Sequence, residues 1–448
     1  MKNILRRLLL AYRPIDDRLR QVRLYANLSR SLQQRYNVFM ASRNISADQD
    51  AAGQAYSRNF STIAPRQDTL LFECYWGKKF GDNPLAIYRA LMRSQPANHF
   101  RIYWVTSPEG ESPPVEITRN PQVILVQTGS REYGIALLEA GYLVNNVTFP
   151  PYFIRRPGQR YCNTWHGIPM KAMGRDMAAP LISMANSQRN FLQSDLILES
   201  SDYYRWATIR PYCVEQLVSS ALTPCGTPRV DDTLIAKLSV DDLRRRYGIS
   251  QNQKVVLFAP TWRGNSTDIS PVFSDQAKLC ARIARELGDD HFVLFSAHQM
   301  VRVAAADMPR NSALLANGDN INDILSIVDV MISDYSSILF DFLPADRPIV
   351  LFTPDIEQYR EERGLYLEPA DLPCADTRTL PDLIAAIRAG RRPSEFPEYA
   401  AMRQRFTPLE DGEAASRALQ LLLNPPATAA RLPDTRKRLL IAPGGMIP

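Results

Sequence analysis

The chain has 448 residues, which is too long for one ordinary hydrophobic core and predicts two or three domains. Hydrophobic residues at 45% and charged residues at 22% exclude a disordered chain or a fibrous repeat. The six cysteines form no Cys-x-x-Cys pair and no cluster with the four histidines. This cysteine pattern argues against a zinc site and a disulfide framework, and it favours a reducing cytoplasm.

The net charge of +6 is concentrated at the N-terminus. Residues 1–36 contain nine Lys or Arg against two acidic residues, a local charge of +7 that leaves −1 for the remainder. Apolar residues at helical spacing over Leu5–Tyr12 and Leu24–Leu32 predict two amphipathic helices with basic faces. Such helices can lie on an anionic membrane surface, and the alternative is a helical extension that packs on the body of the protein.

Other partners and targeting signals are not expected for this N-terminal segment. Nucleic acid is not expected as a partner, because aromatic residues are not interleaved with the basic ones as a base-stacking surface requires. The apolar run Leu8–Leu10 is too short for a signal peptide. No apolar run reaches about 18 residues, so a membrane-spanning helix is not predicted.

Strand-like and helix-like segments alternate along the rest of the chain, a pattern typical of parallel α/β sheets. Residues Ser42–Arg66 are polar and small and predict a linker. The first predicted strands are Thr69–Tyr75, Arg101–Thr106, Val123–Gln127, Tyr142–Asn146 and Arg160–Trp165, with helices over Pro84–Ser94 and Arg131–Ala140. After a pause around Leu222–Leu243, the second predicted strands are Lys254–Ala259, Phe292–Ser296, Val328–Ser333 and Ile349–Phe352. A last helix is expected over Gly412–Leu423.

Two successive α/β series predict two domains of the nucleotide-binding kind that face each other across a cleft. The boundaries that we predict are an extension and linker over 1–66, an N-terminal domain over 67–235, a C-terminal domain over 236–423, and a flexible tail over 424–448.

His166 lies where a catalytic base would be expected. It follows the predicted strand Arg160–Trp165 and precedes a turn that contains Gly167 and Pro169. Ligands of open α/β sheets bind outside the carboxyl ends of the strands, so the position suits an active site. The alternative is a structural histidine beside Trp165, and the local pattern leaves both open.

A phosphate site is predicted where the strand Val328–Ser333 runs into Asp334 and the hydroxyls of Ser336 and Ser337. An apolar, helix-like segment follows, so both hydroxyls would stand near a helix N-terminus, where backbone N–H groups can receive phosphate. Ordinary capping of the helix by serine is the alternative.

Two further predicted strand ends carry candidate phosphate ligands. Thr261 and Arg263 follow one strand, and His298 follows the next. Arg263 offers a planar fork of donors, and His298 could hydrogen-bond a phosphate oxygen or protonate a leaving phosphate. Because both lie at corresponding strand ends of one sheet, together they favour a site.

With these motifs the chain resembles the CDP-glycerol glycerophosphotransferases of bacterial teichoic acid and capsule synthesis. The resemblance covers roughly Leu70–Leu423. It rests on ordered motifs at Phe72–Leu91, Asn163–Asp176, Gly226–Asp231, Phe258–Gly264, Ile332–Phe342, Arg347–Tyr366 and Asp411–Leu419.

The resemblance implies two Rossmann-like domains of the glycosyltransferase-B type, with the acceptor bound mainly by the first and the nucleotide donor by the second. It implies that His166 is the general base, which takes a proton from an acceptor hydroxyl as that oxygen attacks the β-phosphorus of CDP-glycerol and expels CMP. His298 would neutralise or protonate the departing phosphate. Expected donor contacts are Thr261, Arg263, Asp334, Ser336 and Ser337, and expected acceptor or phosphate contacts are Lys171, Gly167 and Arg229.

The remaining expectations concern the substrates and the location. The chain reads Ser296-Ala297-His298-Gln299, whereas similar proteins usually have a proline after this histidine. CDP-ribitol could therefore replace CDP-glycerol, and the acceptor would be a glycan or polyol phosphate that could be lipid-linked. No Asp-x-Asp motif lies near the donor site, so no metal is expected to be obligatory, although Mg²⁺ could accompany the diphosphate. The expected location is the cytoplasmic membrane of a bacterium, peripheral on its inner face.

Two other functions stay open from the sequence. One is a sugar transferase of the same fold that uses a UDP- or GDP-sugar. The other is a non-catalytic surface protein on a degenerate scaffold.

Overall fold

The computed structural model describes residues 47–94, 99–177, 181–219, 221–236, 238, 240–261, 272–296, 308–316 and 318–424. The predicted N-terminal amphipathic helices and the tail beyond Asn424 lie outside these ranges. None of the helices within them is long and apolar enough to span a bilayer.

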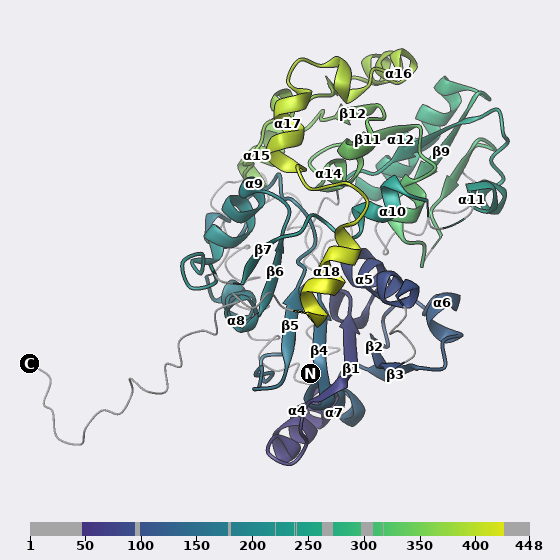
Figure 1. The fold of residues 1–448 in the computed structure, drawn as a ribbon. Coiled ribbons are helices and arrows are strands. Elements are labelled where there is room, and N and C mark those ends of the chain that lie inside the picture. The colour runs from purple at the N-terminus through teal and green to yellow at the C-terminus, as the bar shows by residue number, and fades with distance from the viewer. Residues whose placement is uncertain are drawn as a thin grey trace, which may run out of the picture.

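Two sheets with only parallel pairing organise these residues, one above the other in Figure 1. The first has the order β3-β2-β1-β4-β5-β6-β7 and the second has the order β10-β9-β8-β11-β12-β13. The first sheet contains β1 (Arg66–Glu73), β2 (Arg101–Thr106), β3 (Val123–Gln127), β4 (Ala140–Asn145), β5 (Arg160–Asn163), β6 (Leu196–Glu199) and β7 (Leu222–Pro224). The second contains β8 (Lys254–Phe258), β9 (His291–Phe295), β10 (Ser312–Leu314), β11 (Val330–Ser333), β12 (Ile349–Phe352) and β13 (Ala375–Thr377).

Helices cover the sheets on both faces, which confirms the α/β class. The first half contains α4 (Ala47–Asn59), α5 (Asp82–Arg93), α6 (Val115–Thr118), α7 (Arg131–Glu139), α8 (Ala185–Gln193), α9 (Asp202–Tyr204) and α10 (Val230–Leu234). The second half contains α11 (Val240–Tyr247), α12 (Val272–Leu287), α13 (Ile321–Leu325), α14 (Ile338–Phe342), α15 (Ile356–Arg363), α16 (Leu380–Ala389), α17 (Tyr399–Phe406) and α18 (Ala414–Leu423). Because helices lie on both faces, central strands such as β8 are apolar without alternation, and Val255–Phe258 are all buried.

Each sheet has a point where the strand order reverses. In the first sheet it lies between β1 and β4, and in the second between β8 and β11. The connections from neighbouring strands leave toward opposite sides at such a point, which opens a crevice at the carboxyl ends of the strands. The two reversals therefore mark where ligands are expected to bind.

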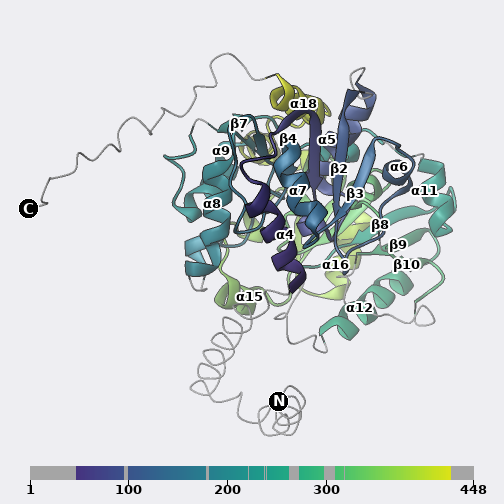
Figure 2. The same cartoon turned by 90° about the horizontal axis from the view of Figure 1, so that it is seen from below.

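The expected linker over Ser42–Arg66 is wrong for residues 47–59, which form α4. This helix lies along α7, as Figures 1 and 2 both show. Ala52 and Tyr56 are buried there, and the Tyr56 hydroxyl donates to the carbonyl of Ile154 at 2.8 Å. A side chain at Gly134 of α7 would lie 2.3 Å from the Ala52 carbonyl oxygen, so the small residues serve close helix packing.

The C-terminal helix α18 returns to the first half of the chain, whereas α17 before it lies beside the second half (Figure 1). Ala418 and Leu422 share a core with Leu91 of α5. Asp231 of α10 caps the helix, because its carboxylate accepts from the backbone N–H groups of residues 414 and 415 at 3.1 and 2.8 Å. The chain therefore crosses between the two halves twice, and our domain boundaries stay a prediction.

Candidate functional site

His166 lies beside the strand reversal of the first sheet. Its Nδ1 is 2.9 Å from the backbone carbonyl oxygen of Asn146, which follows β4. The Asn146 side chain accepts from the backbone N–H of Tyr75, which follows β1, also at 2.9 Å. Three neighbouring strand ends are thus joined around the histidine, as its place in the sequence predicts.

The turn that carries His166 is held on both sides. The Asn163 side chain accepts from the backbone N–H of Trp165 at 2.9 Å, and Asn83 of α5 donates to the Trp165 carbonyl at 3.1 Å. Trp165 has a left-handed φ of 49°, and its ring packs against His166 with centroids 4.5 Å apart. These contacts fix the imidazole before any substrate binds.

The hydrogen bond to Asn146 also determines which nitrogen of His166 can act as a base. A carbonyl oxygen only accepts, so Nδ1 carries the proton and the lone pair is on Nε2. Burial lowers the pKa of His166 below the ordinary 6.5, against smaller opposing effects of the Asn146 hydrogen bond and the Asp82 charge. The side chain is therefore neutral at pH 7 and able to accept a proton.

Gly167 brings the second half of the chain to this turn. It has a left-handed φ of 122°, and a Cβ built there would lie 2.6 Å from Nη2 of Arg229 and 3.2 Å from Oγ of Ser337. Ser337 precedes α14 in the second half. The structure thus places His166, Arg229 and Ser337 together, although Ser337 is 171 positions from His166 in the sequence.

Arg229 forms ion pairs with two buried carboxylates. Its Nε and Nη2 donate to Asp341 of α14 at 2.7 and 3.0 Å, and its Nη1 donates to Asp82 of α5 at 2.8 Å. These pairs favour a role in joining the two halves. The phosphate contact that we expected for Arg229 stays a prediction.

The strand reversal of the second sheet carries the other predicted group. Asp334, after β11, accepts from the backbone N–H of Thr261, after β8, at 2.8 Å and also from the Thr261 hydroxyl. The same oxygen accepts from the backbone N–H of Tyr335 at 2.6 Å. Asp334 and Thr261 therefore hold two strand ends together, which supports a role in shaping the loop.

The two serines differ in their contacts. Ser336 accepts a long hydrogen bond of 3.4 Å from the backbone N–H of Ile338. Ser337 makes no side-chain cap to α14, and its hydroxyl has no hydrogen-bond partner among the described residues. Both are half-buried, so Ser337 in particular is available to a phosphate oxygen.

Lys171 lies on a second connection between the halves. Its backbone pairs antiparallel with Leu365, and the Tyr366 N–H donates to the Met170 carbonyl at 2.7 Å. The Lys171 side chain is exposed beside this connection.

Arg263 and His298 lie outside the described residues, so their roles stay predictions. Among the residues that the structure describes, no group of three His, Cys, Asp or Glu side chains could hold a metal ion.

Asp82 and Asp341 lie within the quoted motifs and Asn146 ends a predicted strand, but the sequence analysis did not predict that these three residues hold the site together. Two signals were available. Asn145 and Asn146 form a polar pair directly after an apolar strand, and Asp341 interrupts the apolar segment of α14.

Replacing Gly167 with alanine is expected to lower kcat at least tenfold, because the new Cβ would displace the turn from Arg229 and Ser337. Steady-state kinetics with thermal unfolding would measure this. Gly248→Ala is the matched control, since Gly248 also has a left-handed φ, of 70°, but no atom within 4 Å of the added carbon. Equal effects of both substitutions on kcat would show that backbone strain alone explains the loss.

Two parallel sheets with the strand order of nucleotide-binding folds carry His166 at one strand reversal and a serine hydroxyl from the other close beside it, an arrangement that suits an α/β enzyme with its site at the strand ends. Residues 55–424 match the model of one family, described as CDP-glycerol:poly(glycerophosphate) glycerophosphotransferase. The chain belongs to this family and is a glycerophosphotransferase, as its motifs indicate.

Similar proteins support this assignment. The chain is 26% identical over 378 residues to a teichoic acid poly(glycerol phosphate) polymerase of Bacillus spizizenii, which covers 81% of this chain and 93% of that protein. It is 26% identical over 375 residues to a teichoic acid glycerol-phosphate transferase of Staphylococcus aureus, with 80% and 93% covered. The solved structure of the wall teichoic acid polymerase TagF soaked with CDPG has a TM-score of 0.70 at 22% identity, covering 87% of this chain and 97% of that one, and shows the likeness in fold.

Proposed function

We propose that His166 is the general base of a transfer of glycerol phosphate from CDP-glycerol to a hydroxyl of a teichoic acid or related cell-envelope acceptor. The supporting observation is the hydrogen bond from Nδ1 to the Asn146 carbonyl, because it leaves the lone pair of a neutral imidazole on Nε2, where it can accept a proton. In this proposal the acceptor lies over the first sheet and the donor over the second, across a cleft between two domains.

In the proposed step, Nε2 takes the proton of the acceptor hydroxyl while that oxygen bonds to the β-phosphorus of CDP-glycerol. The bond from this phosphorus to the bridging oxygen breaks, and CMP leaves with the bonding electron pair. Phosphoryl transfer depends mainly on positioning and on donors that stabilise the phosphate oxygens. Ser336 and Ser337 would supply such donors, together with Arg263, and His298 would protonate the departing phosphate.

The test is nucleotide release. With an acceptor that ends in glycerol phosphate, the protein should release CMP from CDP-glycerol, and chromatography should resolve CMP from uncleaved donor. CDP-ribitol in a parallel reaction would show whether the polyol is selected, and an assay with and without EDTA would show whether Mg²⁺ contributes. Release of UDP or GDP from a nucleotide sugar, without CMP from either CDP-polyol, would instead identify a sugar transferase.

We also propose that the basic segment of residues 1–36 holds the protein on the inner face of the cytoplasmic membrane. Its local charge of +7 and its leucine spacing support this. Removing residues 1–36 should lower binding to anionic vesicles several-fold at low salt, and added salt should lower binding of the full chain in the same way. Co-sedimentation would measure both, with neutral vesicles as the control. Equal vesicle binding with and without the segment would contradict the proposal.

A further inference from the structure

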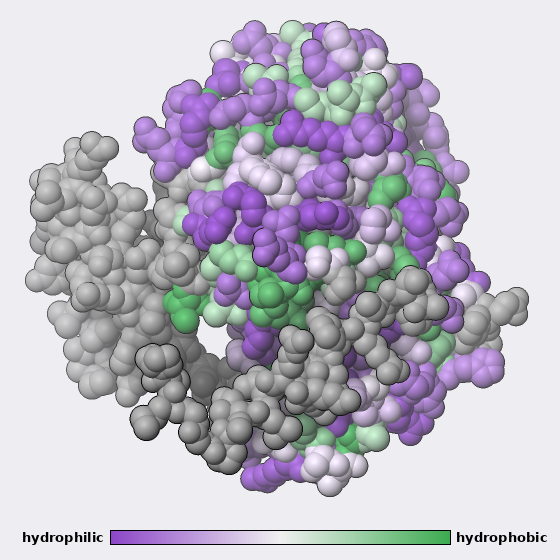
Figure 3. All heavy atoms as spheres, turned by 60° about the vertical axis from the view of Figure 1, so that its left-hand side comes forward, coloured by the Kyte–Doolittle hydropathy of each residue, from purple (hydrophilic) through white to green (hydrophobic). Residues whose placement is uncertain are grey.

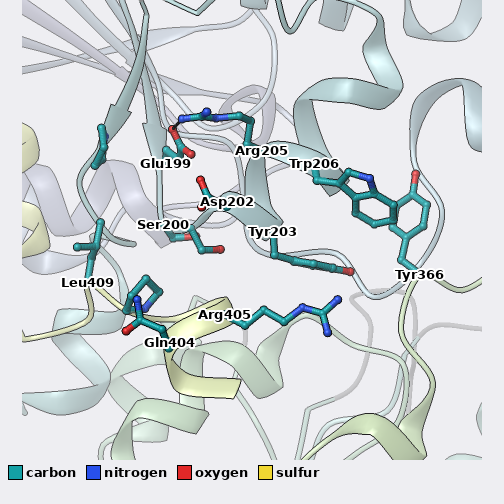
Figure 4. Close-up of a pocket in the computed structure, with 13 residues that line it drawn as sticks. Glu199, Ser200, Asp202, Tyr203, Arg205, Trp206, Tyr366, Gln404, Arg405 and Leu409 are labelled. Carbon is teal, nitrogen blue, oxygen red and sulfur yellow. Dashed lines mark hydrogen bonds and ion pairs between the residues drawn. The ribbon is translucent and has the colours of Figure 1, made fainter. Parts of the chain in front are cut away.

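A cavity of about 770 Å³ lies near the segment that follows the turn of His166, and Figure 4 shows the residues that line it. Two of its lining residues hydrogen-bond directly to the continuation of that turn. The Tyr203 hydroxyl donates to the Pro169 carbonyl at 2.9 Å, and the Tyr366 N–H donates to the Met170 carbonyl at 2.7 Å. These two contacts connect the lining of the cavity to the segment that carries the proposed base.

One wall of the cavity is aromatic. Trp206 is 42% exposed, and its ring meets Tyr366 edge-on, at 4.9 Å and 63°, and Tyr203 at 5.7 Å. Figure 4 shows the three rings along one side of the cavity. An exposed tryptophan among tyrosines offers an apolar face with hydroxyl groups at its edge.

This wall is held in place without a ligand. The guanidinium of Arg210, which does not line the cavity, stacks on Trp206 at 4.8 Å from the ring centroid. Arg210 also pairs with Asp176 at 2.7 Å, and Asp176 accepts from the Tyr366 hydroxyl at 2.7 Å. Trp206 itself lies in a π-helical turn, a rare conformation that is frequent at functional sites.

The opposite wall is polar and lies at the carboxyl end of β6. Glu199 ends the strand and accepts from Nη2 of Arg205 at 2.9 Å. Ser200 follows, is 3% exposed, and its hydroxyl has no hydrogen-bond partner among the residues that the structure describes. A buried hydroxyl without a partner is costly, and a ligand hydroxyl in the cavity would satisfy it.

The charges around the cavity are balanced. Glu199 and Asp202 are acidic, and Arg205 and Arg405 are basic. A surface for a polyanionic poly(glycerol phosphate) chain alone would need an excess of cations. The edge-on aromatic corner also lacks the two parallel faces between which a nucleobase stacks.

We propose that this cavity binds a sugar ring of the acceptor. The inference rests on the proposed function, because it assigns the acceptor of that reaction a glycan part. The C–H face of a pyranose would pack on Trp206, and its hydroxyl groups would bond to Ser200, Asp202 and Arg405. Figure 3 shows that hydrophilic residues dominate the surface on the side of the molecule that it presents, with hydrophobic residues in smaller patches between them.

The first experiment measures binding without turnover. Saturation-transfer NMR with methyl hexopyranosides should show contact with the wild-type protein, and Trp206→Ala should reduce the signal at least fivefold while Trp206→Phe retains most of it. Leu217→Ala is the control, because Leu217 is 62% exposed and does not line the cavity. Equal signals for the wild type and Trp206→Ala, or displacement of the sugar by CMP, would overturn the inference.

The second experiment uses the reaction. Trp206→Ala should raise KM at least tenfold for an acceptor that carries a sugar, and by less than twofold for an acceptor made of glycerol phosphate alone. Equal changes in KM for both acceptors would overturn the inference. If the wild type releases no CMP, the proposed function fails. The NMR experiment still tests by itself whether the cavity binds a sugar.

Discussion

The His166→Ala variant is expected to lose about 10²- to 10⁴-fold in kcat for CMP release, the usual contribution of a general base. The loss should fall mainly on kcat, because the imidazole would take the acceptor proton only in the transition state. Steady-state rates at saturating CDP-glycerol and acceptor would measure it. Binding of CDP-glycerol, followed by calorimetry, should stay close to that of the wild type.

The pH dependence provides an independent readout of the same residue. Burial lowers the pKa of His166 below 6.5, so the base stays neutral down to a more acidic pH than an exposed histidine would. The wild-type kcat/KM should therefore fall only below pH 6.5, as His166 becomes protonated. Removing the side chain should abolish this acidic limb.

His99→Ala is the matched control. His99 is exposed and precedes β2 at the amino edge of the sheet, whereas His166 lies at the carboxyl ends of the strands. Its rate and pH profile should equal those of the wild type. A His166→Ala variant within tenfold of the wild type, or an unchanged acidic limb, would exclude His166 as the base.

Most of the central strands could be predicted because each is a long apolar run between turn residues. The strands that the sequence did not reveal are β6, which has four residues as do the predicted β5, β11 and β12, and β7, β10 and β13, which have three each. A segment of three residues is too short to show an alternation of apolar and polar residues. It becomes recognisable as a strand only through its pairing with a neighbouring strand. Helix α4 was missed for a related reason. Its alanines and Gly53 look like a linker until α7 packs against them.

The residues of the candidate site also fall into two groups, those that the sequence predicts and those that only the structure reveals. His166 and Ser337 were predictable because each stands in a local motif after an apolar strand. The groups that position them come from distant segments. Arg229 is 147 positions from Asp82 and 112 from Asp341, and nothing local to any of the three indicates the pairing. Local patterns thus revealed the candidate reactive groups, and only the tertiary fold revealed their support.

Arg229→Met is expected to lower the free energy of unfolding by about 3–5 kcal/mol, the cost of leaving buried charges without their partner. The side chains of Asp82 and Asp341 are 9% and 6% exposed, and methionine replaces the volume of arginine without its charge. Urea unfolding at pH 7 would measure the change. The double variant Arg229→Met with Asp341→Asn should recover part of the loss, because one unpaired carboxylate is removed.

The loss of unfolding free energy in Arg229→Met should depend on pH in a defined direction. Burial raises the pKa of Asp341 above the ordinary 3.8 against the Arg229 charge, whereas for Asp82 the Arg229 charge and hydrogen bonds outweigh burial and lower the pKa. Losing Arg229 should shift both pKa values upward, so both carboxylates should bind protons more tightly in the folded variant than in the folded wild type. For such groups stability is present below the unfolded pKa and is lost as pH rises. The Arg229→Met deficit should therefore be smaller near pH 4 than at pH 7.

Arg66→Met is the matched control for the same kind of pair. Arg66 contacts Asp68 at 2.9 Å, but both side chains are about half exposed, at 53% and 52%. Solvent screens exposed pairs, so Arg66→Met should change the free energy of unfolding far less than Arg229→Met at either pH. If Arg229→Met resembles Arg66→Met, the charges around Arg229 are solvated, and this contact does not fix the two halves around His166.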